Sequence, residues 1–269
     1  LATAIKLKQI NADANVCIVE KASEVGAHIL SGNVFETKAL DELLPDWQSM
    51  EGCPLKTKVS KEKFLVLSEK SYFSVPSFLL PPVQHNKGNY ITSLANLCRW
   101  LGQVAEGMGV EIYPGFAASE ILYDEQGKVR GVATNDMGLD INNEKKDSYE
   151  PGIELHAKVT VFAEGCRGHL GKQLINKFNL SENSDPQQYG IGLKEIWEVP
   201  EENHDEGMVL HSVGWPLEND TYGGSFVYHA ENKQIYLGYV IGLDYSNPYL
   251  SPFEEFQRFK THPAIKKML

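Results

Sequence analysis

The sequence predicts an α/β (α+β) fold in which a Rossmann-like part is followed by an antiparallel sheet. Three observations favour this class. A helical pattern over residues 1–10 precedes a short apolar run, residues 15–19, that ends at Glu20, and this order is typical of the second half of a βαβ unit. A second apolar run, residues 158–162, leads into a turn and a helix. After Pro186, several runs rich in aromatic and β-branched residues predict antiparallel strands.

The residues between the two apolar runs begin irregularly. From 21 to 89 we expect an irregular stretch with one short helix at 37–44. Apolar residues recur at steps of three and four over residues 90–108, which predicts an amphipathic helix. Residues 110–113 then predict a strand.

A hairpin and a polar loop complete the first part of the chain. Residues 119–123 and 129–134 flank a turn, which predicts a pair of strands. Residues 135–150 are polar and charged and predict a surface loop, which precedes a short strand at 153–155. We therefore expect a first domain over residues 1–185.

The remaining residues, 186–269, predict a second domain. Its strands are expected at 189–199, 209–213, 225–229 and 235–243. A closing helix is expected to begin at Ser251, because a serine N-cap, a proline at the first helical position and Glu254 form a capping pattern. The two ends of the sequence, Leu1 and Leu269, stand inside helical patterns, so we expect this chain to be an internal piece of a longer protein.

Composition excludes several classes of protein. The chain has 269 residues, with 25 Lys and Arg against 36 Asp and Glu, for a net charge of −11. We expect no nucleic-acid partner, because general nucleic-acid binding needs basic surface. Four cysteines in this length exclude a disulfide-stapled scaffold. The sequence also contains no apolar run of the length that a membrane-spanning helix needs.

Two predicted strand ends carry the residues of a dinucleotide site. In dinucleotide-binding βαβ units, an acidic residue that ends the second strand accepts hydrogen bonds from the adenosine ribose, and Glu20 stands in that place. Ala163–Gly165 lies between a predicted strand and a helix, where glycine lets backbone approach a ligand and helix amides attract anions. The structural alternatives are a solvated turn residue and an ordinary strand-to-helix turn. The order of elements, ending in an antiparallel domain, favours a two-domain flavoprotein that binds FAD.

Short motifs along the whole chain resemble one family of flavoproteins. They are Gly26–Gly32, Gly88–Ile91, Val110–Gly115, Leu155–Thr160, Phe162–Gly165, Tyr189–Glu195, Gly214–Leu217, Thr221–Phe226, Gly242–Tyr245 and Asn247–Pro252. In this order they resemble the electron transfer flavoprotein–ubiquinone oxidoreductase family. The resemblance implies an FAD enzyme that accepts electrons from reduced electron transfer flavoprotein and reduces ubiquinone to ubiquinol. It also implies a monotopic location on the matrix face of the mitochondrial inner membrane or the cytoplasmic face of the bacterial inner membrane.

The resemblance assigns residues to the FAD site. The cofactor-binding residues that it implies are Glu20, Lys21, Gly26, His28, Ser31, Gly32, Ala117, Ala163, Glu164 and Gly165. Glu20 would hold the ribose, and Lys21 would offset its charge. The segment around His28 would pass along the flavin, although a structural role for this histidine is the alternative. Backbone groups at Ala117 would face the adenine.

The same resemblance places ubiquinone against Tyr222, Gly223 and Gly224. Two glycines lack side chains, so a flat ring could lie on the backbone and its carbonyl oxygen could meet an amide. A strand bulge or a turn is the structural alternative for this pair of glycines.

A membrane-contacting hairpin is expected at about residues 64–82. This segment is too short and too rich in proline to span a membrane, but its apolar surface would suit shallow insertion. Four flanking lysines, Lys58, Lys61, Lys63 and Lys70, fit anionic headgroups. The residues expected to contact the membrane are Phe73, Val75, Pro76, Phe78, Leu79 and Leu80. A core segment beneath a long loop is the structural alternative.

The family carries a [4Fe–4S] cluster on four cysteine thiolates. Cys17, Cys53, Cys98 and Cys166 are scattered, so we assign no metal ligand here and expect the cluster ligands to lie outside this chain. No catalytic acid or base is assigned, because flavin and cluster carry the redox chemistry. Two other functions stay open. They are an FAD monooxygenase or geranylgeranyl-reductase-like flavoenzyme without a cluster, and a membrane-bound interaction module that is not an enzyme.

Overall fold

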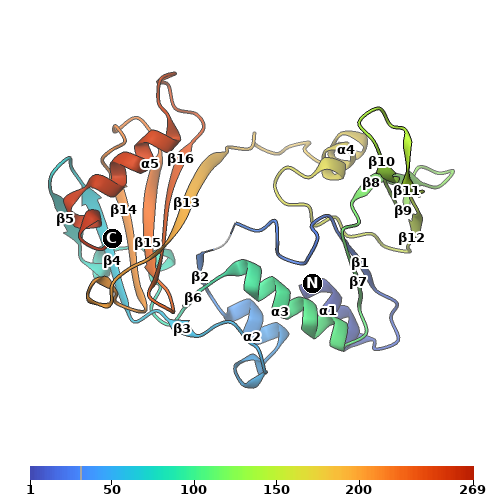
Figure 1. Cartoon of the computed structure of the whole chain (residues 1–269), viewed down its shortest axis with the longest axis horizontal. Helices are drawn as coiled ribbons and strands as arrows, with labels where there is room; N and C mark the ends of the chain where they lie inside the picture. The colour runs from blue at the N-terminus through green and yellow to red at the C-terminus, as the bar shows by residue number, and fades with distance from the viewer. Residues whose placement is uncertain (31) are drawn as a thin grey trace. The chain divides into compact units, whose positions relative to one another are not determined.

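The protein's structure, a computed structural model, describes residues 1–30 and 32–269. The chain forms two compact units, and each unit is discontinuous in sequence. Unit 1 consists of Leu1–His28 and Leu101–Pro186, and unit 2 consists of Ile29–Trp100 and Gln187–Leu269 (Figure 1). Helix α3 (Leu94–Gly107) contributes residues to both units.

Unit 1 begins with the elements expected from its first twenty residues. Helix α1 (Ala2–Ile10) is followed by β1 (Cys17–Glu20). Strand β1 pairs in parallel with β7 (Glu111–Pro114), which comes directly after α3. Ile5 of α1 and Ala105 of α3 are buried. The helix–strand order predicted for the start of the chain is therefore confirmed.

The rest of unit 1 is a small antiparallel sheet with one helix. The sheet has the order β12-β9-β8, with β8 (Ala118–Tyr123), β9 (Val129–Thr134) and β12 (Glu154–His156). Helix α4 (His169–Phe178) packs Leu170 against Ile121 and Val132 in a small core. The predicted hairpin and the helix that begins at His169 are confirmed.

Two expectations for unit 1 are wrong. Residues 135–150 are not a loop, because β10 (Met137–Leu139) and β11 (Lys145–Glu150) pair as an antiparallel ribbon. Asp140 Oδ1 fixes the turn of this ribbon by accepting hydrogen bonds from the backbone N–H groups of Asn142 and Glu144, at 2.8 Å each. Residues 158–162 form no strand, since no strand of the described chain pairs with them.

Unit 2 is built on a six-stranded sheet with the order β13-β16-β15-β14-β4-β5. Its strands are β4 (Lys61–Leu67), β5 (Tyr72–Val75), β13 (Gly190–Glu198), β14 (Met208–Gly214), β15 (Gly223–His229) and β16 (Gln234–Gly242). Neighbouring strands are antiparallel, except that β4 and β14 are parallel. The four strands predicted after Pro186 are confirmed, and β4 and β5 join them from much earlier in the chain.

One face of this sheet is covered by helix α5 (Pro252–Thr261). Phe256 and Phe259 of this helix pack with Leu237 and other buried side chains of the sheet. The predicted cap is present, because the Ser251 hydroxyl accepts a hydrogen bond from the Glu254 N–H at 3.4 Å. A short helix, α6 (Pro263–Lys266), follows.

The other face of the sheet is covered at one end by a three-stranded sheet of order β2-β6-β3. Its strands are β2 (Asn33–Phe35), β3 (Thr57–Lys58) and β6 (Tyr90–Thr92). Val59 and Ile91 pack here on Val209 and Tyr228. The short helix expected at 37–44 is present as α2 (Lys38–Leu43). Short 3₁₀ helices are η1 (Trp47–Ser49), η2 (Ser77–Leu79), η3 (Pro82–Gln84) and η4 (Glu201–Asn203).

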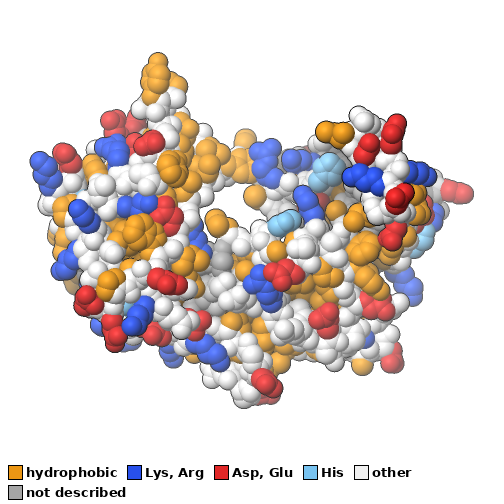
Figure 2. Space-filling view, in the orientation of Figure 1, with side chains coloured by type: hydrophobic (Ala, Val, Ile, Leu, Met, Phe, Trp, Pro, Cys, Tyr) orange, Lys and Arg blue, Asp and Glu red, His pale blue; other side chains and the backbone are white. Residues whose placement is uncertain are grey.

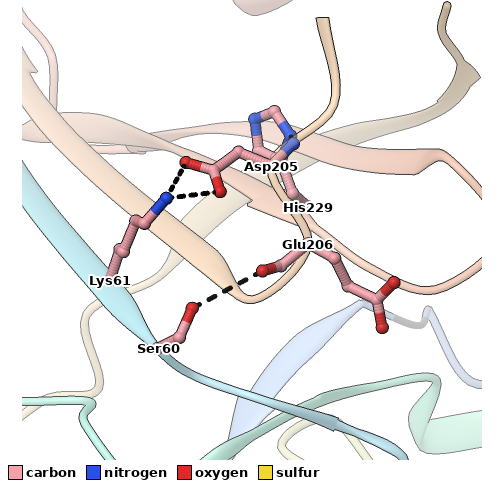
Figure 3. Close-up of polar contacts among 5 residues, drawn as sticks. All are labelled: Ser60, Lys61, Asp205, Glu206 and His229. Atoms are coloured by element: carbon pink, nitrogen blue, oxygen red, sulfur yellow. Dashed lines mark hydrogen bonds and ion pairs between the residues drawn. The ribbon is translucent and has the colours of Figure 1, made fainter. Parts of the chain in front are cut away.

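Polar contacts connect residues at the start of β4 with residues just before β14 (Figure 3). Lys61 Nζ contacts both carboxylate oxygens of Asp205, at 2.7 and 2.9 Å, and the Ser60 hydroxyl donates to the Glu206 carbonyl oxygen at 3.5 Å. The Asp205 N–H donates to His229 Nδ1 of β15 at 3.0 Å. These contacts position β4 beside β14. The hairpin at 64–82, expected within the first domain, therefore shares its sheet with the strands that follow Pro186.

Candidate functional site

The carboxyl ends of β1 and β7 meet at one edge of unit 1, because the two strands are parallel. Glu20 lies opposite Pro114 in this pairing, and the Gly115 N–H donates to the Ala22 carbonyl oxygen at 2.7 Å. Gly115 has a φ of 83°, which an L side chain rarely adopts, so glycine allows this tight turn. The turn brings Glu20 and the segment leading to Ala117 to the same edge.

The Glu20 carboxylate is only partly engaged by the protein. Its Oε1 accepts a hydrogen bond from the Ala22 N–H at 2.7 Å, which holds the side chain over the end of β1. A carboxylate has two oxygens and about four acceptor positions, so this group retains capacity to accept further hydrogen bonds. Lys21 next to it is exposed, as is His28. Gly26 is buried, and Ser31 lies outside the described residues.

The Glu164 carboxylate differs from that of Glu20, because both of its oxygens are hydrogen-bonded within the protein. Its two carboxylate oxygens accept hydrogen bonds from the backbone N–H groups of Leu170 at 3.0 Å and Gly171 at 2.6 Å. The first turn of α4, which we expected to attract a cofactor anion, is therefore occupied by the chain's own carboxylate. Ala163 and Gly165 on either side remain exposed.

Unit 2 carries a row of small and apolar residues across the face opposite α5. Strand pairing places Val66 beside Val213 and Phe73, and Val240 beside Gly224. Val213 and Gly224 are neighbours as well, since a Cβ added at Gly224 would lie 3.5 Å from Val213 Cγ1. We call this row, from Phe73 through Val66, Val213 and Gly224 to Val240, the apolar row. Its side chains are solvent-accessible, from 36% for Val213 to 64% for Phe73.

Gly223 and Gly224 lie in regular strand pairing, opposite Ile241 and Val240 of β16, and form no bulge there. A Cβ at Gly224 would lie 2.8 Å from the Ser212 carbonyl oxygen, and one at Gly223 would lie 2.5 Å from the Val240 carbonyl oxygen. Close strand packing therefore requires both glycines, and it also leaves bare backbone on the sheet. Tyr222 precedes them and is 79% exposed.

The segment expected to contact a membrane presents apolar side chains to solvent. Phe78 is 83% exposed, and Phe73 and Leu79 are each 64% exposed. Pro76 is also exposed, whereas Val75 and Leu80 are half-buried. The alternative of a core segment is therefore wrong for the exposed members. Figure 2 shows hydrophobic side chains lying among charged ones over the end of the sheet that carries β4 and β5.

Residues 1–30 and 32–269 contain neither a metal-binding cluster nor a membrane-spanning helix. There, no group of three or more His, Cys, Asp and Glu side chains is arranged to hold a metal ion. In the same residues, no helix combines the length and the apolar character needed to cross a bilayer. Cys17 and Cys166 are exposed, Cys53 is buried and Cys98 is half-buried.

A known family model covers the four C-terminal strands of the unit 2 sheet, β13 to β16. Residues 189–269 match the family model described as the ubiquinone-binding domain of ETF-QO. Over its whole length the chain is 58% identical to the electron transfer flavoprotein-ubiquinone oxidoreductase of Pseudomonas aeruginosa, of which it covers 50%. It is 54% identical to the mitochondrial protein of that name from Dictyostelium discoideum and 52% identical to that from Bos taurus, and it covers 44% of each.

Over its whole length the chain is therefore similar to electron transfer flavoprotein–ubiquinone oxidoreductases. It spans about half the length of the curated relatives that it matches. The resemblance stated from the sequence motifs is therefore confirmed.

Solved structures with a similar fold include a reductase-like protein and a flavin-dependent brominase. A geranylgeranyl bacteriochlorophyll reductase-like protein from Thermoplasma acidophilum matches with a TM-score of 0.68 at 16% identity, over 99% of this chain and 60% of that one. A flavin-dependent brominase variant matches with a TM-score of 0.64 at 15% identity, over 99% of this chain and 61% of that one. These likenesses concern the fold alone, and they confirm the predicted α/β (α+β) fold class with a Rossmann-like part.

Sequence reasoning missed two features of the unit 2 sheet. Lys194 of β13 lies within a quoted motif, and its pKa is lowered to about 8 by burial. His211 Nε2 and the Tyr228 hydroxyl are hydrogen-bonded at 2.8 Å, and burial lowers the histidine pKa despite the opposing effect of Glu62. A charged residue in the middle of a strand rich in glycine and apolar residues is a signal that could have pointed to Lys194.

Proposed function

We propose that the protein containing this chain is a membrane-associated FAD enzyme that accepts electrons from reduced electron transfer flavoprotein and reduces ubiquinone. The observation that carries the proposal is the match of residues 189–269 to the ubiquinone-binding model. Those residues include four of the six strands of the unit 2 sheet, β13 to β16. The identity of 58% over the whole chain to a protein of that name supports it further.

The residues of unit 1 fit one end of an extended FAD. Glu20 would accept hydrogen bonds from the ribose hydroxyls with the capacity left beside its bond to Ala22, and Lys21 would offset its charge. The backbone leading to Ala117 would face the adenine, because its turn is tied to the end of β1. FAD, when bound, supplies the electron-transfer chemistry of the enzyme.

Other segments would meet the rest of the cofactor. The exposed backbone at Ala163 and Gly165 would approach the pyrophosphate and ribose, while Glu164 holds this turn against the first turn of α4. Gly26, His28, Ser31 and Gly32 would pass along the flavin.

The quinone ring would lie on the backbone at Gly223 and Gly224, next to the exposed ring of Tyr222. The apolar row supports this placement, since it connects Gly224 through Val213 and Val66 to Phe73. A ubiquinone has a polar ring and an apolar tail, and such a row gives the tail an apolar surface between the ring and the exposed hairpin.

The exposed hairpin would insert shallowly into one leaflet of an inner membrane. Phe73, Phe78 and Leu79 supply the apolar surface, with Val75, Pro76 and Leu80 beside them. The nearby Lys58, Lys63 and Lys70 are exposed and would meet anionic headgroups, which act only within about a Debye length. The overall acidity of the chain therefore does not oppose this contact.

The intact protein should also carry a [4Fe–4S] cluster with ligands outside this chain. The test uses the intact protein in detergent, reduced with dithionite, and measures its flavin absorbance and its EPR spectrum. In the same preparation, anaerobically reduced electron transfer flavoprotein is supplied and ubiquinol formation is followed. Bound flavin, a reduced-cluster signal and quinol formation that depends on the electron transfer flavoprotein are expected. Bound flavin with no cluster signal and no quinol formation would contradict the proposal and favour a monooxygenase or prenyl reductase.

A further inference from the structure

Strand β13 lies at one edge of the unit 2 sheet, next to β16 (Figure 1). It has nine residues and pairs with β16 along its whole length without a register shift. No strand among residues 1–30 and 32–269 pairs with its other side. This outer side of β13, which we call the free edge, is therefore about 30 Å of main chain without a sheet partner.

Main-chain bonds at both ends of β13 show which residues point to the free edge. At one end, the Leu243 N–H donates to the Tyr189 carbonyl oxygen at 2.8 Å. At the other end, the Val199 N–H donates to the Lys233 carbonyl oxygen at 3.1 Å. In an antiparallel pair the main-chain groups of alternate residues point to the same side, so the odd-numbered residues of β13 bond to β16. The N–H and C=O groups that point to the free edge belong to the even-numbered residues, which are Gly190, Gly192, Lys194, Ile196 and Glu198.

The free edge lacks most of the features that protect an open strand. Proteins keep edge strands short, interrupt them with proline or a bulge, or place charges on them. The opposite edge strand, β5, has four residues and is followed directly by Pro76. Strand β13 has neither proline nor bulge, and charge protects it only in part, since Glu195 is bonded to Lys260 of α5 and Ile196 is 54% exposed. It is therefore a template for a further strand.

The segment that follows Leu269 in the intact protein is the occupant that the observations favour. The chain spans about half the length of its curated relatives, so a comparable length of chain lies outside it. Met268 and Leu269 pack against the core of the unit 2 sheet, so the chain after them continues from the same unit as β13. Pairing within one chain also avoids the entropy cost of bringing a second molecule to the edge.

We infer that a strand from the segment after Leu269 pairs with the free edge and adds a seventh strand to the six-stranded sheet of unit 2. The inference goes beyond the proposed function, because it concerns how this sheet is completed in the intact protein. It also has a consequence for the face on which the quinone is proposed to lie. Gly192 pairs with Val240 of the apolar row, so the added strand would continue that row past Gly192.

Amide hydrogen exchange of the intact protein tests this pairing residue by residue. The protein is kept in detergent as a monomer, without the electron transfer flavoprotein, and exchange at single residues is resolved by fragmentation in a mass spectrometer. The inward N–H groups of Ile191, Leu193 and Trp197 are the internal control, because β16 protects them in either case. If the added strand is present, the outward N–H groups of Lys194 and Ile196 should exchange at least about 100-fold more slowly than free amides.

A photo-crosslinking amino acid in place of Ile196 then identifies the occupant of the free edge. The same amino acid in place of Phe253, a residue of α5 that is 56% exposed, is the matched control. From position 196, the crosslinked peptide should come from the segment after Leu269. From position 253, that peptide should be absent.

Free exchange of the outward amides, with the inward ones protected, would overturn the inference. A crosslinked peptide from another part of the protein or from a second copy, or no crosslink above the control level, would also overturn it. Protection that appears only after the electron transfer flavoprotein is added would assign the edge to that partner instead. None of these outcomes alters the flavin, cluster and ubiquinol readouts, so the proposed function stands or fails separately.

Discussion

Glu20 and Glu164 show how the same side chain is used in two ways within one unit. Both oxygens of Glu164 accept hydrogen bonds from α4 amides, so its charge is compensated inside the protein. Glu20 accepts one short hydrogen bond from the turn that follows it and keeps acceptor capacity toward solvent. Glu164 therefore uses both oxygens to hold its own turn against α4, whereas Glu20 keeps acceptor positions that a ligand could use.

His229 is a buried histidine that the fold keeps neutral. It is 1% exposed, and its Nδ1 accepts a hydrogen bond from the Asp205 N–H, so the ring proton is on Nε2. Burial, with His204 and Lys63 acting in the same direction and Asp205 against them, lowers its pKa to about 4. The unfolded chain binds this proton near pH 6.5.

We therefore expect acid to destabilise the protein through His229. The unfolded state takes up the proton first as pH falls below about 6.5, so stability is lost between that pH and about 4. The free energy of unfolding should fall by about 2 kcal/mol from pH 7.5 to pH 5 through this group. His229→Asn keeps an acceptor near Asp205 and cannot titrate. Urea denaturation at both pH values should show a smaller loss for this variant, and an equal loss in both proteins would contradict the assignment.

At the scale of elements, the apolar row joins five neighbouring strands into one surface. Val240, Gly224, Val213, Val66 and Phe73 come from β16, β15, β14, β4 and β5 in turn. Because these strands are adjacent, residues far apart in sequence form a continuous path. The path exists only because β4 and β5 belong to this sheet.

The apolar row should matter for long quinone tails more than for short ones. Val213→Ser removes apolar surface from the middle of the row, at a side chain that is partly exposed. We expect the KM for a long-tail ubiquinone in detergent to rise about fivefold, while that for a short-tail analogue stays near wild type. Ile141→Ser, at an exposed turn of unit 1, is the control. Equal effects on both quinones would argue against a tail-binding role.

Local pattern predicted the elements whose partners are close in sequence. The helix over 90–108, the hairpin of β8 and β9, and the acidic residue at the end of β1 follow from periodicity and turn chemistry. Strand β4 was missed, because it pairs with β14 about 150 residues later and its apolar run does not alternate. Lys194 was missed for a related reason, since its neighbour Gly32 comes from a distant segment.

The site residues were predictable to different degrees. The place of Glu20 at the end of β1 could be predicted from the order of helix and strand, but its ribose-binding role came from the resemblance and stays a prediction. For Gly223 and Gly224 the sequence left two interpretations, and strand pairing removes the bulge. The engagement of Glu164 with α4 could not be foreseen, since it depends on where a helix end lies in space.

At the scale of the whole molecule, the exposed hairpin should decide membrane binding. The double substitution Phe73→Ser and Phe78→Ser removes two exposed aromatic side chains from it. Binding to vesicles with anionic lipid, measured by flotation, should weaken about 100-fold. The reason is that each aromatic side chain contributes several-fold to partition from water into the bilayer when the lipid buries it. Phe253→Ser, at a side chain of α5 that is 56% exposed, is the matched control. Unchanged flotation of the double variant would exclude this hairpin as the contact.

The parallel pairing of β4 with β14 also has a consequence for how the protein can be divided and synthesised. A fragment limited to residues 189–269, the span of the family model, would lack β4 and leave β14 with an open edge of unpaired amides and carbonyls. Such edges recruit other chains, so we expect that fragment to aggregate. During synthesis, more than a hundred further residues must follow residues 61–75 before β14, the parallel partner of β4, exists. The exposed hairpin is thus made well before the strand that fixes it in its sheet.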